Sequence, residues 1–182
     1  MRLFNKFLSL ALATVFMATG LYAQTVSTVM PTDTIGREVQ KKINMLPYYE
    51  VFDYINYSID GDTVTLSGKV LNGTNKSAAA AAVKRIPGVA NVVNEIEVLP
   101  AGSMDNTIRR DLYRSLSNMG GLSRYLWPSD PSIRLVVERG RVTLEGYVAN
   151  QTDLNLANMA ARSVSGVFEV TNNLVVDKNK AG

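Results

Sequence analysis

The residues of this 182-residue sequence best suited to chemistry at a surface are arginines set among large aromatic and aliphatic side chains. Guanidinium groups attract anionic headgroups, and Tyr, Trp and Leu suit the boundary between water and an apolar phase. One stretch supplies both kinds: Arg109, Arg110, Tyr113, Arg114, Leu122, Arg124, Tyr125, Leu126 and Trp127. These residues are therefore our candidate site for an anionic phospholipid membrane surface.

The same stretch has a second interpretation in terms of packing. Leu122, Leu126 and Trp127 also suit a plug in a hydrophobic core or in a seam between two units, and the arginines suit a solvated helix face. The two interpretations differ in what they predict for the exposure of Trp127, and both stay open at this point.

Catalytic chemistry finds little support in the sequence. Histidine and cysteine are both absent, which excludes Ser-His and Cys-His pairs, disulfides and the usual zinc sites. Ser67 and Ser77 have no base to activate them, and Asp60 and Asp62 flank a glycine in a pattern typical of a hairpin turn. We expect no catalytic residues, no metal site, no cofactor and no enzymatic activity.

The first 23 residues have the pattern of a secretory signal peptide. Arg2 and Lys6 precede an apolar run from Phe7 to Met17, which is too short to span a bilayer, and cleavage after Ala23 is expected. The formal charge of +3 falls by two to +1 when both cations leave with this segment, so nucleic-acid binding is not indicated. Without a cysteine, a bacterial-type lipid anchor is excluded, and we expect a periplasmic protein.

Hydrophobic spacing predicts the elements that must position the candidate residues. Apolar residues recur at helical spacing from Ile35 to Leu46, and strict alternation predicts two strands joined by a turn at 60–62. The expected elements are a helix over 35–46, strands over 55–60 and 63–70, a helix beginning near Thr74 and ending before Pro87-Gly88, and a strand over 92–98.

This set of elements occurs twice. The sequence Val-Thr-Leu-x-Gly-x-Val at 64–70 recurs at 142–148, an offset of 78 residues, since 142 − 64 = 78. The offset holds downstream without a gap, and Gly88-Val89 falls on Gly166-Val167. Such a long coincidence identifies a tandem repeat of one small unit. The second copy carries five extra residues within 120–128, next to the candidate site.

Each unit is predicted to be α-β-β-α-β, which places the protein in the α+β class. One face of each strand is apolar and the other polar, so we expect a small mixed sheet with helices on one face and water on the other. The alanines Ala79, Ala82 and Ala160 would let a helix lie close to the sheet. Gly68 and Gly146 are expected to serve the same approach.

Each unit resembles the BON domain, a family named for bacterial osmotically inducible and nodulation proteins. The matching features are the Gly-containing turn, Val-Thr-Leu-x-Gly-x-Val, the alanine-rich helix, and Gly-Val followed by Val-x-Asn-x-Ile/Leu-x-Val. The resemblance covers residues 33–99 and 105–177, which we take as two domains. It implies a non-enzymatic cell-envelope protein that binds phospholipid surfaces, in the manner of the osmotic-stress members of the family.

The second domain is the better candidate for membrane binding. The first helix of the first domain carries Arg37, Lys41 and Lys42 but no aromatic partner for them. An alternative from another functional class is a protein–protein adaptor in the periplasm, in which an open sheet face or edge strand takes an envelope protein as partner. Flotation with anionic vesicles separates these alternatives, because an adaptor stays in solution.

Overall fold

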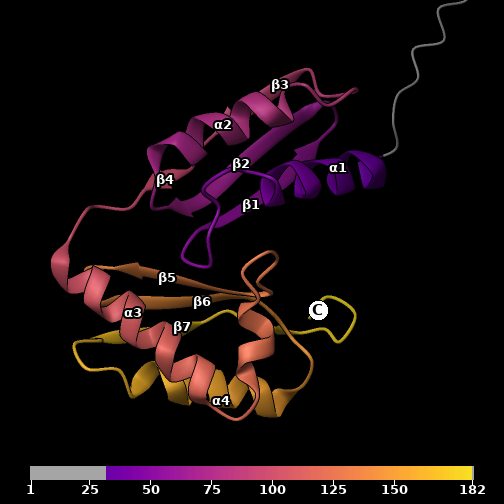
Figure 1. Ribbon diagram of the computed structural model, residues 1–182. Helices are drawn as coiled ribbons and strands as arrows, with labels where there is room; N and C mark the ends of the chain where they lie inside the picture. The colour runs from indigo at the N-terminus through magenta and orange to yellow at the C-terminus, as the bar shows by residue number, and fades with distance from the viewer. Residues whose placement is uncertain (1–31, 182) are drawn as a thin grey trace, which may run out of the picture.

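The computed structural model describes residues 32–181, which form two α+β units, as predicted (Figure 1). The predicted signal peptide lies outside the described residues. The first unit contains α1 (Thr32–Asn44), β1 (Tyr54–Asp60), β2 (Thr63–Val70), α2 (Gly73–Val83), β3 (Asn91–Asn94) and β4 (Glu97–Val98). The second contains α3 (Ser103–Asn118), the 3₁₀-helix η1 (Leu122–Leu126), β5 (Ile133–Glu138), β6 (Arg141–Val148), α4 (Gln151–Arg162), β7 (Glu169–Asn172) and β8 (Val175–Val176).

The two sheets share one topology. In the first unit β2 lies at the centre, antiparallel to β1 on one side and parallel to β3 and β4 on the other. In the second unit β6 occupies the same central place between β5 and the pair β7 and β8. The parallel pairing requires a crossover, which α2 and α4 provide.

A repeated asparagine explains why the last predicted strand of each unit is broken into two. The amide of Asn94 donates to the carbonyl of Lys76 in α2, and its Oδ1 accepts from the Ile96 amide at 3.3 Å. Asn172 makes the equivalent bonds to Leu154 and Leu174. This side chain therefore ties the strand break to the crossover helix in both units.

The two crossover helices begin at asparagines. Asn72 caps α2 by accepting a hydrogen bond from the Thr74 amide, and Asn150 caps α4 by accepting from the Asp153 amide. The helix expected to begin near Thr74 begins at Gly73, with Asn72 as its cap. An N-cap satisfies amides that have no partner within the helix, and the Asn side chain has the required reach.

Gly68 and Gly146 serve a different purpose from the one predicted. Both have a positive φ, of 111° and 109°. A Cβ at Gly68 would lie 2.2 Å from the Tyr54 carbonyl oxygen, and one at Gly146 would lie 2.0 Å from the Ser132 carbonyl oxygen. The close approach is thus to the neighbouring strand and not to a helix. It requires glycine because any side chain would meet backbone atoms.

The open face of the second sheet is not solvated along β5, contrary to the prediction. Residues Ile133 to Val137 are all buried. Figure 1 shows α3 and α4 on the side of this sheet that faces away from the first unit, while the loop between α1 and β1 reaches its other side. The first unit therefore covers part of the face that a lone unit would expose to water.

The loop between α1 and β1 makes two of the hydrogen bonds that join the units; the Lys69–Glu138 ion pair and the bond from Asn44 to Asp130 also join them. The Val51 carbonyl accepts from the Leu135 amide at 2.7 Å, and the Glu50 carbonyl accepts from the Arg134 guanidinium at 3.1 Å. The same guanidinium lies 4.3 Å from the ring centroid of Tyr49. Val51 and Phe52 pack against the hydrophobic core of the second unit although they belong to the first by sequence.

Candidate functional site

Four of the nine candidate residues are buried, so the prediction that they lie on a binding surface is wrong. Arg109 is 3% exposed, Leu122 0%, Tyr125 1% and Leu126 2%. Leu122, Tyr125 and Leu126 belong to η1, which the extra residues of the second copy help to form, and they fill the core of the second unit. The packing interpretation is therefore correct for Leu122 and Leu126, and Tyr125, which it did not include, is buried with them.

Arg109 is buried because its guanidinium group hydrogen-bonds a carbonyl at the edge of the sheet. Its Nη2 donates to the Val137 carbonyl of the edge strand β5 at 2.6 Å, and its Nη1 donates to Asn106 Oδ1 at 2.8 Å. Burial lowers the pKa of Arg109, and the nearby carboxylates of Asp105 and Asp53 partly offset this effect. Arg109, which lies next to the apolar stripe of α3, therefore has a structural role.

Tyr125 and Arg124 fasten η1 to the start of α4. The Tyr125 hydroxyl donates to Asp153 Oδ2 at 2.5 Å and accepts from the Ala149 amide at 3.0 Å. The Arg124 guanidinium binds the same carboxylate oxygen at 2.6 Å and lies 4.7 Å from the Tyr125 ring centroid. Arg124 remains about half exposed, but its charge is already paired with that of Asp153.

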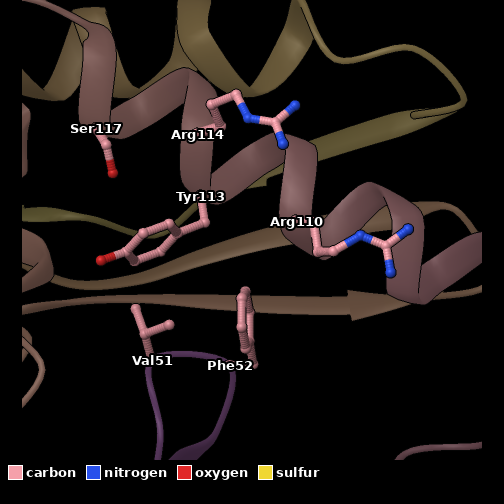
Figure 2. A pocket seen from close by; sticks show the side chains of 6 residues that line it. All are labelled: Val51, Phe52, Arg110, Tyr113, Arg114 and Ser117. Carbon is pink, nitrogen blue, oxygen red and sulfur yellow. The ribbon is translucent and has the colours of Figure 1, made fainter.

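The structure brings three candidate residues together at a groove between the two units. Arg110 and Arg114 are exposed on α3, and Tyr113 between them is half-buried. The groove has a volume of about 520 Å³ and mainly apolar walls. Its lining residues are Val51, Phe52, Arg110, Tyr113, Arg114 and Ser117. Figure 2 shows Val51 and Phe52 on the loop of the first unit, facing the residues of α3.

The two arginines of this groove make weak contacts to neighbours on their own helix. Arg110 donates to the Thr107 hydroxyl at 3.1 Å, and Arg114 pairs with Asp111 at 3.3 Å. Both contacts are exposed to solvent, where such pairs contribute little to stability. The guanidinium groups can therefore turn to an anionic ligand at small cost.

Trp127 lies apart from this groove, at the C-terminal end of η1. It is 66% exposed, so the interpretation of this tryptophan as core is wrong. It is not among the residues that line the groove. The candidate surface thus consists of a grooved part on α3 and a separate exposed indole.

Val51 and Phe52 were not among the predicted site residues. Their signal in the sequence is an apolar pair between a helix ended by Pro47 and a strand that begins at Tyr54. Apolar side chains in a connecting loop need a surface on which to pack. The sequence alone does not reveal that this surface belongs to the other unit.

A second hollow, of about 1070 Å³, lies between the units and is more polar. Its walls include four tyrosines, at positions 49, 54, 57 and 147, together with Arg134 and Lys180. Two of the rings are already covered, because Arg134 lies over Tyr49 and Lys180 over Tyr147. We regard this hollow as part of the joint between the units.

Within residues 32–181, no group of three or more Asp or Glu side chains is placed to hold a metal ion. In that same range, no helix combines the length and apolarity needed to cross a bilayer.

Comparison with protein families identifies both units. The family model described as the BON domain matches residues 31–100 and again residues 105–178. The chain belongs to the BON-domain family. BON domains bind phospholipids and occur in envelope and stress proteins, and the family is in general non-catalytic. BON-domain proteins are also generally associated with the periplasm and cell envelope.

The other comparisons are less informative. Curated proteins gave no match. Among solved structures, the chain is similar to CdsD, a structural protein of the type III secretion system of Chlamydia trachomatis, at 11% identity, covering 80% of this chain and 94% of that one with a TM-score of 0.31. The C-terminal domain of CdsD gives 12% identity, 82% and 100% coverage, and a TM-score of 0.32.

Proposed function

We propose that this protein binds anionic phospholipid membranes through its second BON domain and so supports envelope integrity or osmotic-stress tolerance. The observation that carries the proposal is the placement of two exposed arginines, Arg110 and Arg114, beside an apolar groove that contains Tyr113. We further propose that the protein acts in the periplasm, to which residues 1–23 would direct it.

The chemistry of this face matches that of a lipid interface. A guanidinium group binds phosphate oxygens through paired N–H donors, and an aromatic ring with a polar tip suits the headgroup region. Each cation near an anionic membrane contributes about 1 kcal/mol of binding free energy. Two arginines and a partly buried tyrosine therefore support reversible binding that weakens as salt increases.

The matched test reverses charge on equivalent helices of the two domains. Arg110→Glu with Arg114→Glu removes the cationic face of α3, whereas Lys41→Glu with Lys42→Glu makes the same charge change on α1, where both lysines are exposed. Flotation would be measured with vesicles of phosphatidylglycerol and phosphatidylethanolamine, and with vesicles of phosphatidylcholine, at low and high salt.

The parent protein is expected to float with the anionic vesicles, and less at high salt. Each double reversal changes the local charge by four units, so at about 1 kcal/mol per charge the α3 variant should lose at least tenfold in membrane partitioning. The α1 variant should float like the parent. If the α3 variant floats normally, membrane docking through this face is refuted. A parent protein that stays in solution with all vesicles would favour the adaptor function.

A further inference from the structure

We propose that the lipid site is shared between the two domains, with the Val51–Phe52 loop of the first domain and α3 of the second forming opposite walls of one groove. The apolar part of a single anionic phospholipid would lie in this groove, against both walls, and Arg110 and Arg114 would hold its phosphate. This inference rests on the proposed function and adds a requirement for the first domain.

The walls of the groove come from parts of the chain far apart in sequence. The rings of Phe52 and Tyr113 meet edge to face, with centroids 6.4 Å apart and planes inclined by 61°. Val51 extends the apolar surface on the side of Phe52. The second domain alone would therefore supply one wall, and its groove would be incomplete.

The charges around the groove define the class of its occupant. The cations at the groove are Arg110 and Arg114, and Asp111 is the acidic partner of the second. An apolar groove next to two guanidinium groups fits a molecule with an alkyl part and an anionic head. A purely ionic ligand would leave the walls unused, and a neutral alkane would leave the arginines unused.

The loop that forms the first wall is held in place before any ligand arrives. The buried carboxylate of Asp53 accepts hydrogen bonds from the Leu71 amide at 2.6 Å and from the Glu50 amide at 3.0 Å. The contacts of Val51 and Glu50 with β5 fix its other side. A preformed wall loses little entropy on binding, which favours a specific site over a loose contact.

The test separates the walls from the charges by using a lipid and its headgroup. Dihexanoyl phosphatidylglycerol, kept below the concentration at which it forms micelles, presents a phosphate with short alkyl chains, and glycerol 3-phosphate presents the phosphate alone. Binding of each to the full chain would be measured by titration calorimetry or NMR. The variants are Phe52→Ala in one wall, Tyr113→Ala in the other, and Phe168→Ala as control, since Phe168 is 76% exposed and outside the groove.

The parent is expected to bind the short-chain lipid at least tenfold more tightly than glycerol 3-phosphate. Phe52→Ala and Tyr113→Ala should each lose at least tenfold for the lipid while their affinity for glycerol 3-phosphate stays unchanged, and Phe168→Ala should match the parent for both. Thermal melts of every variant establish that the fold is retained. If Phe52→Ala unfolds at a lower temperature than the parent, the shared groove is judged from the binding of Tyr113→Ala.

The failure of this inference differs from the failure of the proposed function. If the parent floats with anionic vesicles but both wall variants bind the short-chain lipid as tightly as the parent, the shared groove is refuted and surface docking stands. If glycerol 3-phosphate binds as tightly as the lipid, the groove recognises a free phosphate and not an acyl chain. If the parent neither floats nor binds either probe, the proposed function itself is refuted.

Discussion

Tyr125 and Trp127 stand two positions apart in the sequence, yet the first is buried and the second exposed. The difference in exposure follows from the hydrogen-bond partners of the Tyr125 hydroxyl and from the positions of the two residues in η1. The Tyr125 hydroxyl finds Asp153 and the Ala149 amide inside the domain, so its burial leaves no hydrogen-bonding group unsatisfied. Trp127 follows the last residue of η1, where the chain leaves the core. The position of each residue in this short helix therefore decides its role.

We predict that Trp127→Ala changes the free energy of unfolding by less than about 0.5 kcal/mol, because an exposed side chain makes few contacts that folding depends on. Leu126→Ala, one residue earlier and buried, should cost about 2–5 kcal/mol. Chemical denaturation of both variants would measure this. If Trp127 also enters the membrane, Trp127→Ala should lose part of its flotation at an unchanged melting temperature. A large loss of stability at Trp127 would contradict its exposed position.

For single residues, the sequence predicted the chemistry of the candidate site, arginines beside an aromatic ring, better than it predicted which residues belong to the site. The exposed pair of arginines with Tyr113 follows from helical spacing, since these positions lie away from Ile108, Leu112 and Leu116. Arg109 follows Ile108 directly, and its burial depends on the Val137 carbonyl, which belongs to a strand 28 residues later. A hydrogen bond between distant segments leaves no periodic trace in a sequence, so Arg109 could not be assigned correctly.

The crossover helices show how one repeated element can pack differently in its two copies. Ala160 of α4 is completely buried, and its carbonyl accepts a hydrogen bond from Ser115 of α3 at 3.0 Å. Its counterpart Ala82 in α2 is half-buried. Ala160 is thus fully enclosed in the core of the second unit, whereas Ala82 is enclosed only in part in the first.

We predict that Ala160→Leu costs about 1–3 kcal/mol of stability, because the added methyl groups must displace the well-packed neighbours in α3 and the sheet. Ala82→Leu should cost less, since part of the new side chain can point to solvent. Thermal and denaturant unfolding of the two variants compares them directly. Equal losses would mean that α2 packs as closely as α4.

Most elements could be predicted because their signals are local. Alternation identified β1 and β2, and helical spacing identified the helices. The break between β3 and β4 was not predicted, since it depends on a hydrogen bond from the Asn94 side-chain amide to the Lys76 carbonyl in α2. Repetition showed that this asparagine matters without showing what it contacts.

The whole molecule differs from two independent repeats because the first domain rests on the second. An internal repeat predicts the fold of each copy but contains no information about how the copies pack. The covered face of β5 and the groove at Phe52 both follow from that packing. For this reason the sequence placed the candidate site on one domain, whereas the structure places its walls on two.

Tyr54 provides a spectroscopic measure of this packing. Burial raises the pKa of Tyr54 from 10.0 to about 12, and Glu145 and Tyr147 of the second domain add to the effect. The folded state therefore favours the neutral phenol. The stabilisation from Tyr54 is fully present below about pH 10 and is lost as pH rises through about 12.

We predict that absorbance titration near 295 nm shows a tyrosine that ionises close to pH 12, and that Tyr54→Phe removes one residue's share of this late step. Glu145→Gln should move the step to lower pH, because it removes a negative charge near the phenol. An unchanged late step in Tyr54→Phe would show that Tyr54 is not held against the second domain in solution.

The covered edge of strand β5 also affects how readily other chains could pair with this protein. An uncovered edge strand presents unpaired amides and carbonyls that other chains can join, which is a common route to aggregation. Here the first domain occupies the Leu135 amide, and Arg109 occupies the Val137 carbonyl. The joint between the domains thus covers one of the groups through which another chain could add a strand to β5, and Arg109 of the same domain as β5 covers the other.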